Sequence, residues 1–172
     1  MSDFGHRLTL DRIRDGDRLD LVADAGECAA VCERLGLASL DRLDAHAVLT
    51  RDGERIGASG RLKAALEQRC AATGEPLPVH VDEAFELHFV PTPAPGDEEI
   101  ELEAAELDLL FHDNLAIDLG AAIADSLALA LDPYPRSATA GAALKQAGVI
   151  SEEEAGPFAA LAALKQRMAG EG

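Results

Sequence analysis

The stretch RIGASGRLKAAL (residues 55–66) alternates along its whole length. Its even-numbered positions hold Ile, Ala, Gly or Leu, whereas its odd-numbered positions include Arg55, Arg61 and Lys63. A period of two is typical of a β-strand with one buried and one solvated face. Asp52 and Gly53, directly before it, are a strong hairpin signal. We therefore predict that this strand forms a hairpin with the strand before it.

The segments on both sides of this strand show the same alternation. Residues 42–49 alternate before the turn, and residues 79–90 alternate after a loop that is rich in Gly and Pro. Three such strands in succession favour an antiparallel meander with one buried face and one wet face. Gly57 and Gly60 indicate a bulge or a sharp bend in the middle strand.

Two main helices are expected to cover this sheet. In residues 24–36, Asp24 and Glu27 form a capping box, an apolar stripe follows, and Gly36 suits the helix end. In residues 118–131, Asp118 is the expected N-cap of a second apolar helix. Shorter strands are expected near residues 4–10, 19–22 and 106–117, and a last helix after Ser151.

Together these elements predict an α+β fold. Its centre is a bent antiparallel sheet or partial barrel, packed with two main helices and followed by a helical C-terminal tail. We predict an α+β domain over residues 1–136 and the tail over residues 137–172. The sequence shows no long apolar run and no signal peptide. Its three cysteines do not have the spacing of a disulfide-bonded scaffold. This composition predicts a cytoplasmic protein with reduced thiols and no membrane contact.

Charge is distributed very unevenly along the chain. Residues 70–135 contain fifteen Asp and Glu but no Lys or Arg, so the net charge of −17 splits as −2, −15 and 0 over residues 1–69, 70–135 and 136–172. An acidic field repels phosphate and attracts basic protein surfaces. We therefore expect separate surfaces of opposite sign.

The first candidate surface is basic and shares one strand face. It consists of Arg55, Arg61, Lys63 and Arg69. Four cations in a row could contact the phosphates of a nucleic acid. Alternatively, they could form cross-strand pairs with Asp82 and Glu86 on the neighbouring strand. The two interpretations stay open at this stage, and the dependence of binding on salt distinguishes them.

The second candidate surface is acidic. It consists of Glu98, Glu99, Glu101, Glu103, Asp108, Asp113 and Asp118. Such a density of carboxylates could attract a basic ribosomal protein or a basic assembly factor by long-range steering. The alternative is a solvated face that only keeps the protein soluble.

Catalytic and metal-binding patterns are weak. Cys28 and Cys32 lie four positions apart and could ligate zinc together with Cys70 and His46, but they also fit an apolar helix stripe. The chain has no G-x-S-x-G, no H-E-x-x-H and no glycine-rich phosphate loop. Asp113 and Asp118 could form an acid–base pair, but a turn and a helix cap explain them more simply. We predict no enzyme activity, no cofactor and no metal.

Several short motifs follow one another from residue 68 to residue 158. They consist of Gln68, Cys70, Thr73, Glu75, Pro76 and Leu77; Glu83, Phe85 and Phe89; Asp113, Ile117, Asp118, Leu119 and Gly120; Pro133, Tyr134, Pro135 and Arg136; and Pro157 and Phe158. Taken in this order, they resemble the YceD family, whose members support accumulation of large-subunit ribosomal RNA. The chain departs from the family at Gly74, and it lacks a cysteine-rich segment that some members carry near residues 133–136.

The resemblance implies a bacterial-type cytoplasmic protein without an established enzyme activity or cofactor. We therefore predict a non-enzymatic ribosome biogenesis factor that supports 23S rRNA accumulation and large-subunit assembly. The alternative is an acidic adaptor that binds a basic ribosomal protein or assembly factor without direct RNA contact. A third interpretation, an RNA-processing enzyme, requires clustered carboxylates with a divalent metal. The sequence does not determine the oligomeric state.

Overall fold

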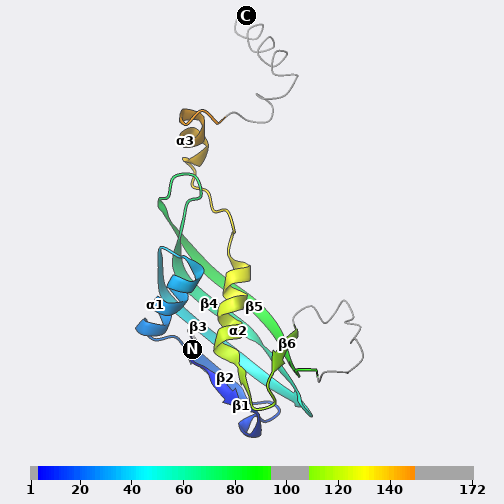
Figure 1. The fold of residues 1–172 in the computed structure, drawn as a ribbon. Helices are drawn as coiled ribbons and strands as arrows, with labels where there is room; N and C mark the ends of the chain where they lie inside the picture. Colours follow the sequence, from blue (N-terminus) through cyan, green and yellow to red (C-terminus); the bar gives the residue numbers. More distant parts are fainter. Residues whose placement is uncertain (1–3, 94–108, 150–172) are drawn as a thin grey trace, which may run out of the picture. The chain divides into compact units, whose positions relative to one another are not determined.

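The structure is a computed structural model that describes residues 4–93 and 109–149. The strands and helices follow one another along the chain as shown in Figure 1. They are β1 (Arg7–Thr9), the 3-10 helix η1 (Leu10–Arg12), β2 (Arg18–Val22), α1 (Ala25–Leu35), β3 (Ser39–Asp52), β4 (Arg55–Arg69), β5 (Pro76–Pro91), β6 (Leu109–His112), β7 (Ala116–Asp118), α2 (Leu119–Ala130) and α3 (Ala140–Gln146).

The chain forms two compact units, which we describe separately. The sheet unit comprises Met1–Arg69 and Pro76–Pro133, and the tail unit comprises Cys70–Glu75 and Tyr134–Gly172. The domain boundary expected at residue 136 stays a prediction. The expected helix after Ser151 lies outside the described residues, as do Pro157 and Phe158.

The predicted three-strand meander forms the centre of the sheet unit. In the order β2-β3-β4-β5-β6, strand β4 pairs antiparallel with β3 on one side and with β5 on the other. The hairpin loop consists of Gly53 and Glu54, between the paired residues Asp52 and Arg55, so it lies one position later than the predicted turn. Gly53 adopts a left-handed φ of 63°. The α+β fold class is confirmed.

One detail of the predicted sheet is wrong. Strand β6 pairs parallel to β5, so the five-stranded sheet is mixed rather than antiparallel. Of the two predicted forms, the structure has the bent sheet, which is open with β2 and β6 as its edges and not closed into a barrel. Strand β7 leaves this sheet and pairs with β1 in a separate two-stranded sheet.

The irregularity expected in β4 lies instead in β3. The register shifts between Leu40 and Arg42, whereas the pairing of β4 is continuous through Gly57 and Gly60. Gly60 has another role, because a Cβ atom there would lie 1.8 Å from the backbone oxygen of His46. The glycine therefore permits β3 and β4 to approach closely.

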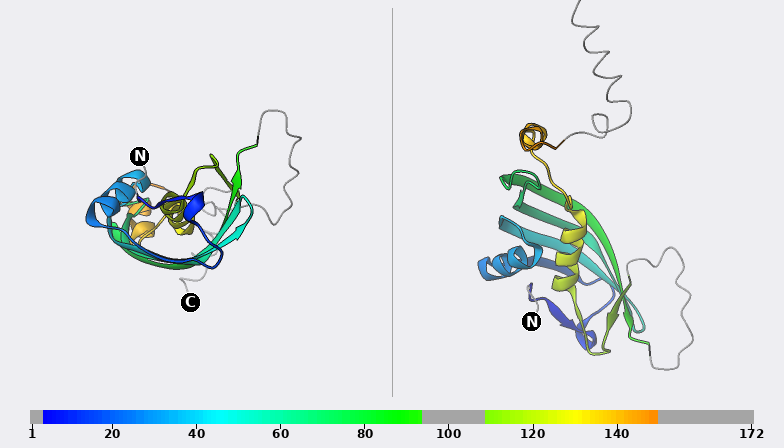
Figure 2. Two further views of the ribbon diagram at one scale, coloured as in Figure 1. Left: turned by 90° about the horizontal axis from the view of Figure 1, so that it is seen from below. Right: turned by 45° about the horizontal axis from the view of Figure 1, so that its top comes forward.

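Both main helices lie on the concave face of the sheet, which curves around them in Figure 2. Helix α1 begins at the predicted capping box of Asp24 and Glu27 and ends at left-handed Gly36. Helix α2 begins at Asp118, whose carboxylate accepts from the backbone N–H of Ala121 at 3.0 Å. The apolar positions of β3, β4 and β5 face these helices and form one core with them. No helix in the described ranges has the length and apolarity needed to cross a bilayer.

Candidate functional site

The four cations of the predicted basic surface share the convex face of β4. They lie at odd positions of a strand whose even positions are buried, and all four are exposed. No register shift occurs between Arg55 and Arg69, so the predicted common face is preserved. We call this solvated side of β2–β5 the outer face.

Cross-strand pairing occurs at the centre of this row. Arg61 hydrogen-bonds to the carboxylate of Asp82, and the Lys63 ammonium lies 3.8 Å from the same carboxylate. The hydrogen bond from Arg61 is the main reason why the pKa of Asp82 is lowered. All three side chains remain more than half exposed, so water screens the pair and its contribution to stability is small.

Charges of both signs continue over the outer face. His46 lies 2.7 Å from Asp20, His88 lies 3.5 Å from Glu86, and Arg42 pairs with Asp44. The cations and carboxylates therefore share one surface. Glu86 lies beside His88 of the same strand.

Most of the predicted acidic surface lies outside the described residues. This applies to Glu98, Glu99, Glu101, Glu103 and Asp108.

Asp113 and Asp118, by contrast, are in the described part and have local structural roles. Asp113 accepts from the backbone N–H groups of Leu115 and Ala116 at 3.0 and 3.2 Å. These bonds, followed by the charge of Arg7, lower the pKa of Asp113. Asp118 caps α2.

These two aspartates border a groove of about 370 Å³ between β6, β7 and α2. His112 closes one side of it and is buried. Its Nδ1 accepts from the N–H of Asn114 at 3.1 Å, and its Nε2 lies 2.9 Å from the carbonyl oxygen of Glu54. Because Nδ1 accepts from a backbone N–H, Nε2 is the ring nitrogen that donates to the carbonyl of Glu54. This bond fixes β6 to the β3–β4 turn.

In the tail unit, family-motif residues form a compact polar cluster. The thiol of Cys70 lies 3.4 Å from the backbone nitrogen of Ser137 and 3.6 Å from its hydroxyl. The backbone N–H of Ala71 donates to the carbonyl of Pro135 at 2.7 Å, and Thr139 donates to the carboxylate of Glu75 at 3.2 Å. These bonds join residues 70–75 to the segment after residue 134.

Hydrogen bonds give Cys70 an acidic thiol. The hydroxyl of Thr73 has the largest effect and the N–H of Ser137 the next, and together they lower the pKa of Cys70 to about 6. The residue is only 2% exposed. Burial opposes the ionisation, but it has less effect than either of these two hydrogen bonds. The Sγ atom of Cys70 accepts from the N–H of Ser137, and this bond favours the ionised thiol.

We expect the stability of the tail unit to rise with pH. Because folding lowers the pKa of Cys70, its contribution is complete above the pKa of an unfolded thiol, about 8.5. It is lost as pH falls through the folded value of about 6. Hydrogen exchange at the Ser137 amide, corrected for intrinsic exchange, should show stronger protection at the higher pH. Cys70→Ser should remove this dependence, and equal protection at both pH values would contradict the assignment.

The other motif residues are placed in both units. Gln68, which is largely buried at the end of β4, donates to the carbonyl of Asp132 at 2.9 Å and so ties β4 to the end of α2. Pro76 begins β5. Pro133 ends the sheet unit, and Arg136 is exposed. Sequence analysis missed Ser137 and Thr139, because nothing in the local sequence indicates their contacts with residues 64 or more positions away.

The suggested zinc ligands are not brought together on α1. The thiol of Cys28 is directed at the carbonyl of Ala23, and that of Cys32 at the carbonyl of Leu37. His46 lies on the outer face, opposite the core that contains Cys28. Within residues 4–93 and 109–149, no three His, Cys, Asp or Glu side chains are grouped so that they could hold a metal ion.

The comparisons with known proteins agree with the motifs. A scan against protein-family models matches residues 58–165 to the family described as large ribosomal RNA subunit accumulation protein YceD. Searches of curated proteins and of solved structures gave no match. The matched range begins within β4, includes the Cys70 cluster, β5, β6 and α2, and spans more than half of the chain. The chain therefore belongs to the YceD family.

Proposed function

We propose that this protein is a non-enzymatic factor for assembly of the large ribosomal subunit. Membership of the family implies a role in the accumulation of large-subunit ribosomal RNA. In the finer hypothesis, the protein works in the cytoplasm and supports 23S rRNA accumulation. Its outer face contacts pre-ribosomal RNA, and its acidic residues bind a basic ribosomal protein or assembly factor.

The observation that supports RNA contact is the exposed row of Arg55, Arg61, Lys63 and Arg69. The two main helices lie on the concave face, so they leave this row open to solvent. Fourteen strand steps at about 3.3 Å give the row a length of roughly 46 Å along β4. A row of this length can meet several phosphates of one RNA strand.

One observation favours the adaptor without RNA contact. Asp82 lies against both Arg61 and Lys63, so a carboxylate already neutralises part of the row. RNA would have to compete with Asp82 for these two side chains. In the adaptor hypothesis, the pairs on the outer face serve only solubility and strand pairing.

Removing the two central cations distinguishes the two hypotheses. For Arg61→Gln/Lys63→Gln, we expect weaker binding to a large-subunit rRNA fragment. The slope of log affinity against log salt should fall in magnitude by about 1.4, because two phosphate contacts to single-stranded RNA are lost. Filter binding over a series of salt concentrations measures both quantities.

A matched control removes the same charge elsewhere. Arg12 and Arg14 are exposed and lie outside β4, so Arg12→Gln/Arg14→Gln should leave the slope unchanged. Equal slopes for the wild type and both double variants would reject RNA contact at the outer face and favour the adaptor. In cells, normal 23S rRNA levels after removal of the protein would reject the assembly function itself.

A further inference from the structure

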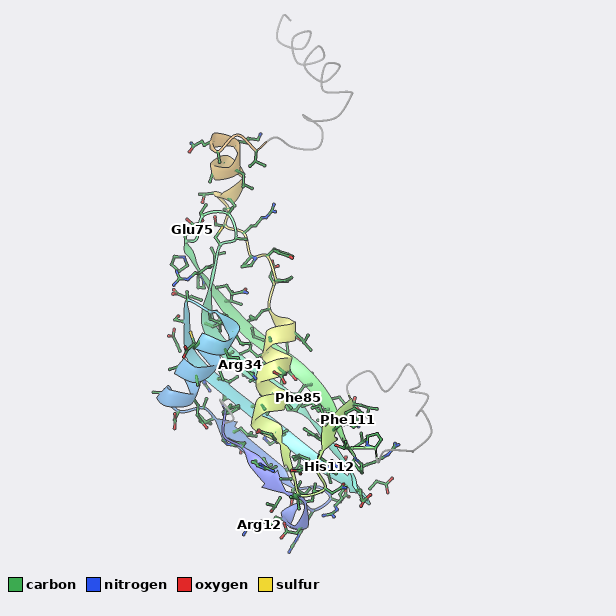
Figure 3. All side chains as sticks on the ribbon, viewed as in Figure 1. Arg12, Arg34, Glu75, Phe85, Phe111 and His112 are labelled. Atoms are coloured by element: carbon green, nitrogen blue, oxygen red, sulfur yellow. The ribbon has the colours of Figure 1, made fainter. Side chains whose placement is uncertain are left out.

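The groove between β6, β7 and α2 is lined by both apolar and charged side chains. Leu110, Ala121 and Ala122 contribute to its apolar lining. Phe111, which also lines it, is 56% exposed. Figure 3 labels Phe111 beside His112 on β6. Aromatic side chains are enriched where proteins contact one another, so Phe111 is a candidate contact residue.

Carboxylates also line this groove. Asp113, Asp118 and Asp125 line it, and Arg7 is the cation among the lining residues. Arg7 lies 3.2 Å from Asp113, and Arg34 lies 3.2 Å from Asp125. The lining thus keeps a net negative charge.

The charge of the groove restricts its occupant. Nucleic acid is repelled by the carboxylates. Residues 94–108 of the chain carry seven acids and no base, so their charge also disfavours them as the occupant. A peptide with Lys or Arg gains from the carboxylates, and an apolar side chain within it gains from contact with Phe111.

We propose that this groove docks a short basic peptide of a partner protein. One apolar side chain of the peptide is seated against Phe111, and flanking Lys or Arg side chains face Asp113, Asp118 and Asp125. The inference rests on the proposed function, since it specifies how the basic protein partner would be bound. The groove lies entirely within the sheet unit and does not use the outer face.

Binding of a model peptide to the full chain tests the groove. The probe is a fluorescein-labelled nonapeptide of Lys and Arg with one central Leu, measured by anisotropy. Phe111→Ala and Asp125→Asn should each weaken its affinity by about tenfold, as loss of a central anchor or a facing charge does. Replacing the peptide's Leu by Gly should have a similar effect.

Matched variants separate docking from general attraction to an acidic protein. Leu129→Ala removes an apolar side chain that is 85% exposed on α2, and Glu33→Gln removes an exposed carboxylate of α1; neither residue lines the groove. Both variants should bind the peptide like the wild type. Equal affinities for all four variants, equal affinity for the Gly peptide, or no binding to the wild type would each overturn the proposal.

Failure of the groove assignment can be distinguished from failure of the proposed assembly role. Levels of 23S rRNA in cells that lack the protein test the assembly role without reference to the groove. If those levels fall and the groove variants still bind the peptide like the wild type, the groove assignment is wrong and the assembly role stands. If the levels stay normal while the peptide depends on Phe111 and Asp125, the groove is a peptide site and the assembly role is wrong.

Discussion

Phe4→Ala is expected to lower the free energy of unfolding of the sheet unit by about 3–5 kcal/mol, the usual cost of truncating a buried phenylalanine. Phe4 is 0% exposed and belongs to the core formed by the sheet and α2. Its position close to the N-terminus suggests a dispensable residue, but its complete burial predicts the opposite. Urea denaturation followed by far-ultraviolet circular dichroism measures the change.

Phe111→Ala provides the matched control. It makes the same substitution at a phenylalanine that is 56% exposed on β6. A surface substitution of this kind usually changes stability by no more than about 0.5 kcal/mol. A loss of similar size for both variants would mean that Phe4 does not occupy the core position described here. The pair also shows that the effect expected for Phe111→Ala on peptide binding does not come from unfolding.

The central elements could be predicted because their signals are local. The alternation in β4 and the Asp52–Gly53 turn signal predict the strand and its hairpin partner within a few residues. The start of α1 follows from the spacing of Asp24 and Glu27. The parallel pairing of β6 has no such signal, since its four residues join β5 across a separation of more than fifteen positions. Helix α3 lies within the predicted helical tail, but the sequence did not give its bounds, because its N-cap, Thr139, makes no side-chain capping bond.

The roles of the candidate site residues could likewise be predicted where they depend on neighbours in the sequence, and not where they depend on distant residues. The turn role of Asp113 and the capping role of Asp118 follow from neighbours two or three positions away, and both are confirmed. The common face of the basic row was also predicted, because strand parity is local. Whether Asp82 pairs with that row depends on the register between β4 and β5, so the sequence left it open. The groove could not be predicted, because it requires β6, β7 and α2 in their final positions.

Gly120→Ala should destabilise the sheet unit even though the position is helical. In a helix, replacing Gly by Ala normally stabilises by up to about 1 kcal/mol. At Gly120, however, a Cβ atom would lie 2.0 Å from the carbonyl oxygen of Phe4 and 3.0 Å from the nitrogen of His6. Both contacts are with backbone, which cannot rotate away. Overpacking of this kind costs about 1–3 kcal/mol or more, so the clash outweighs the gain in helix propensity.

Urea denaturation shows directly whether Gly120→Ala raises or lowers the free energy of unfolding. Gly141→Ala is the control, because Gly141 lies within α3 and has no atom within 4 Å of the added Cβ. It should not destabilise the protein, whereas Gly120→Ala should lower the urea midpoint.

The clash at Gly120 should also interact with the loss of Phe4. To relieve it, the chain at Phe4 must move away from α2, which withdraws the Phe4 ring from the core and strains the bond from Leu119 N–H to the His6 carbonyl. Once Phe4→Ala has removed the ring, this movement costs less. The double variant should therefore be more stable than the sum of the single losses predicts, by about 0.5–3 kcal/mol, as for residues in contact. Strict additivity would show that the N-terminal segment and α2 respond independently.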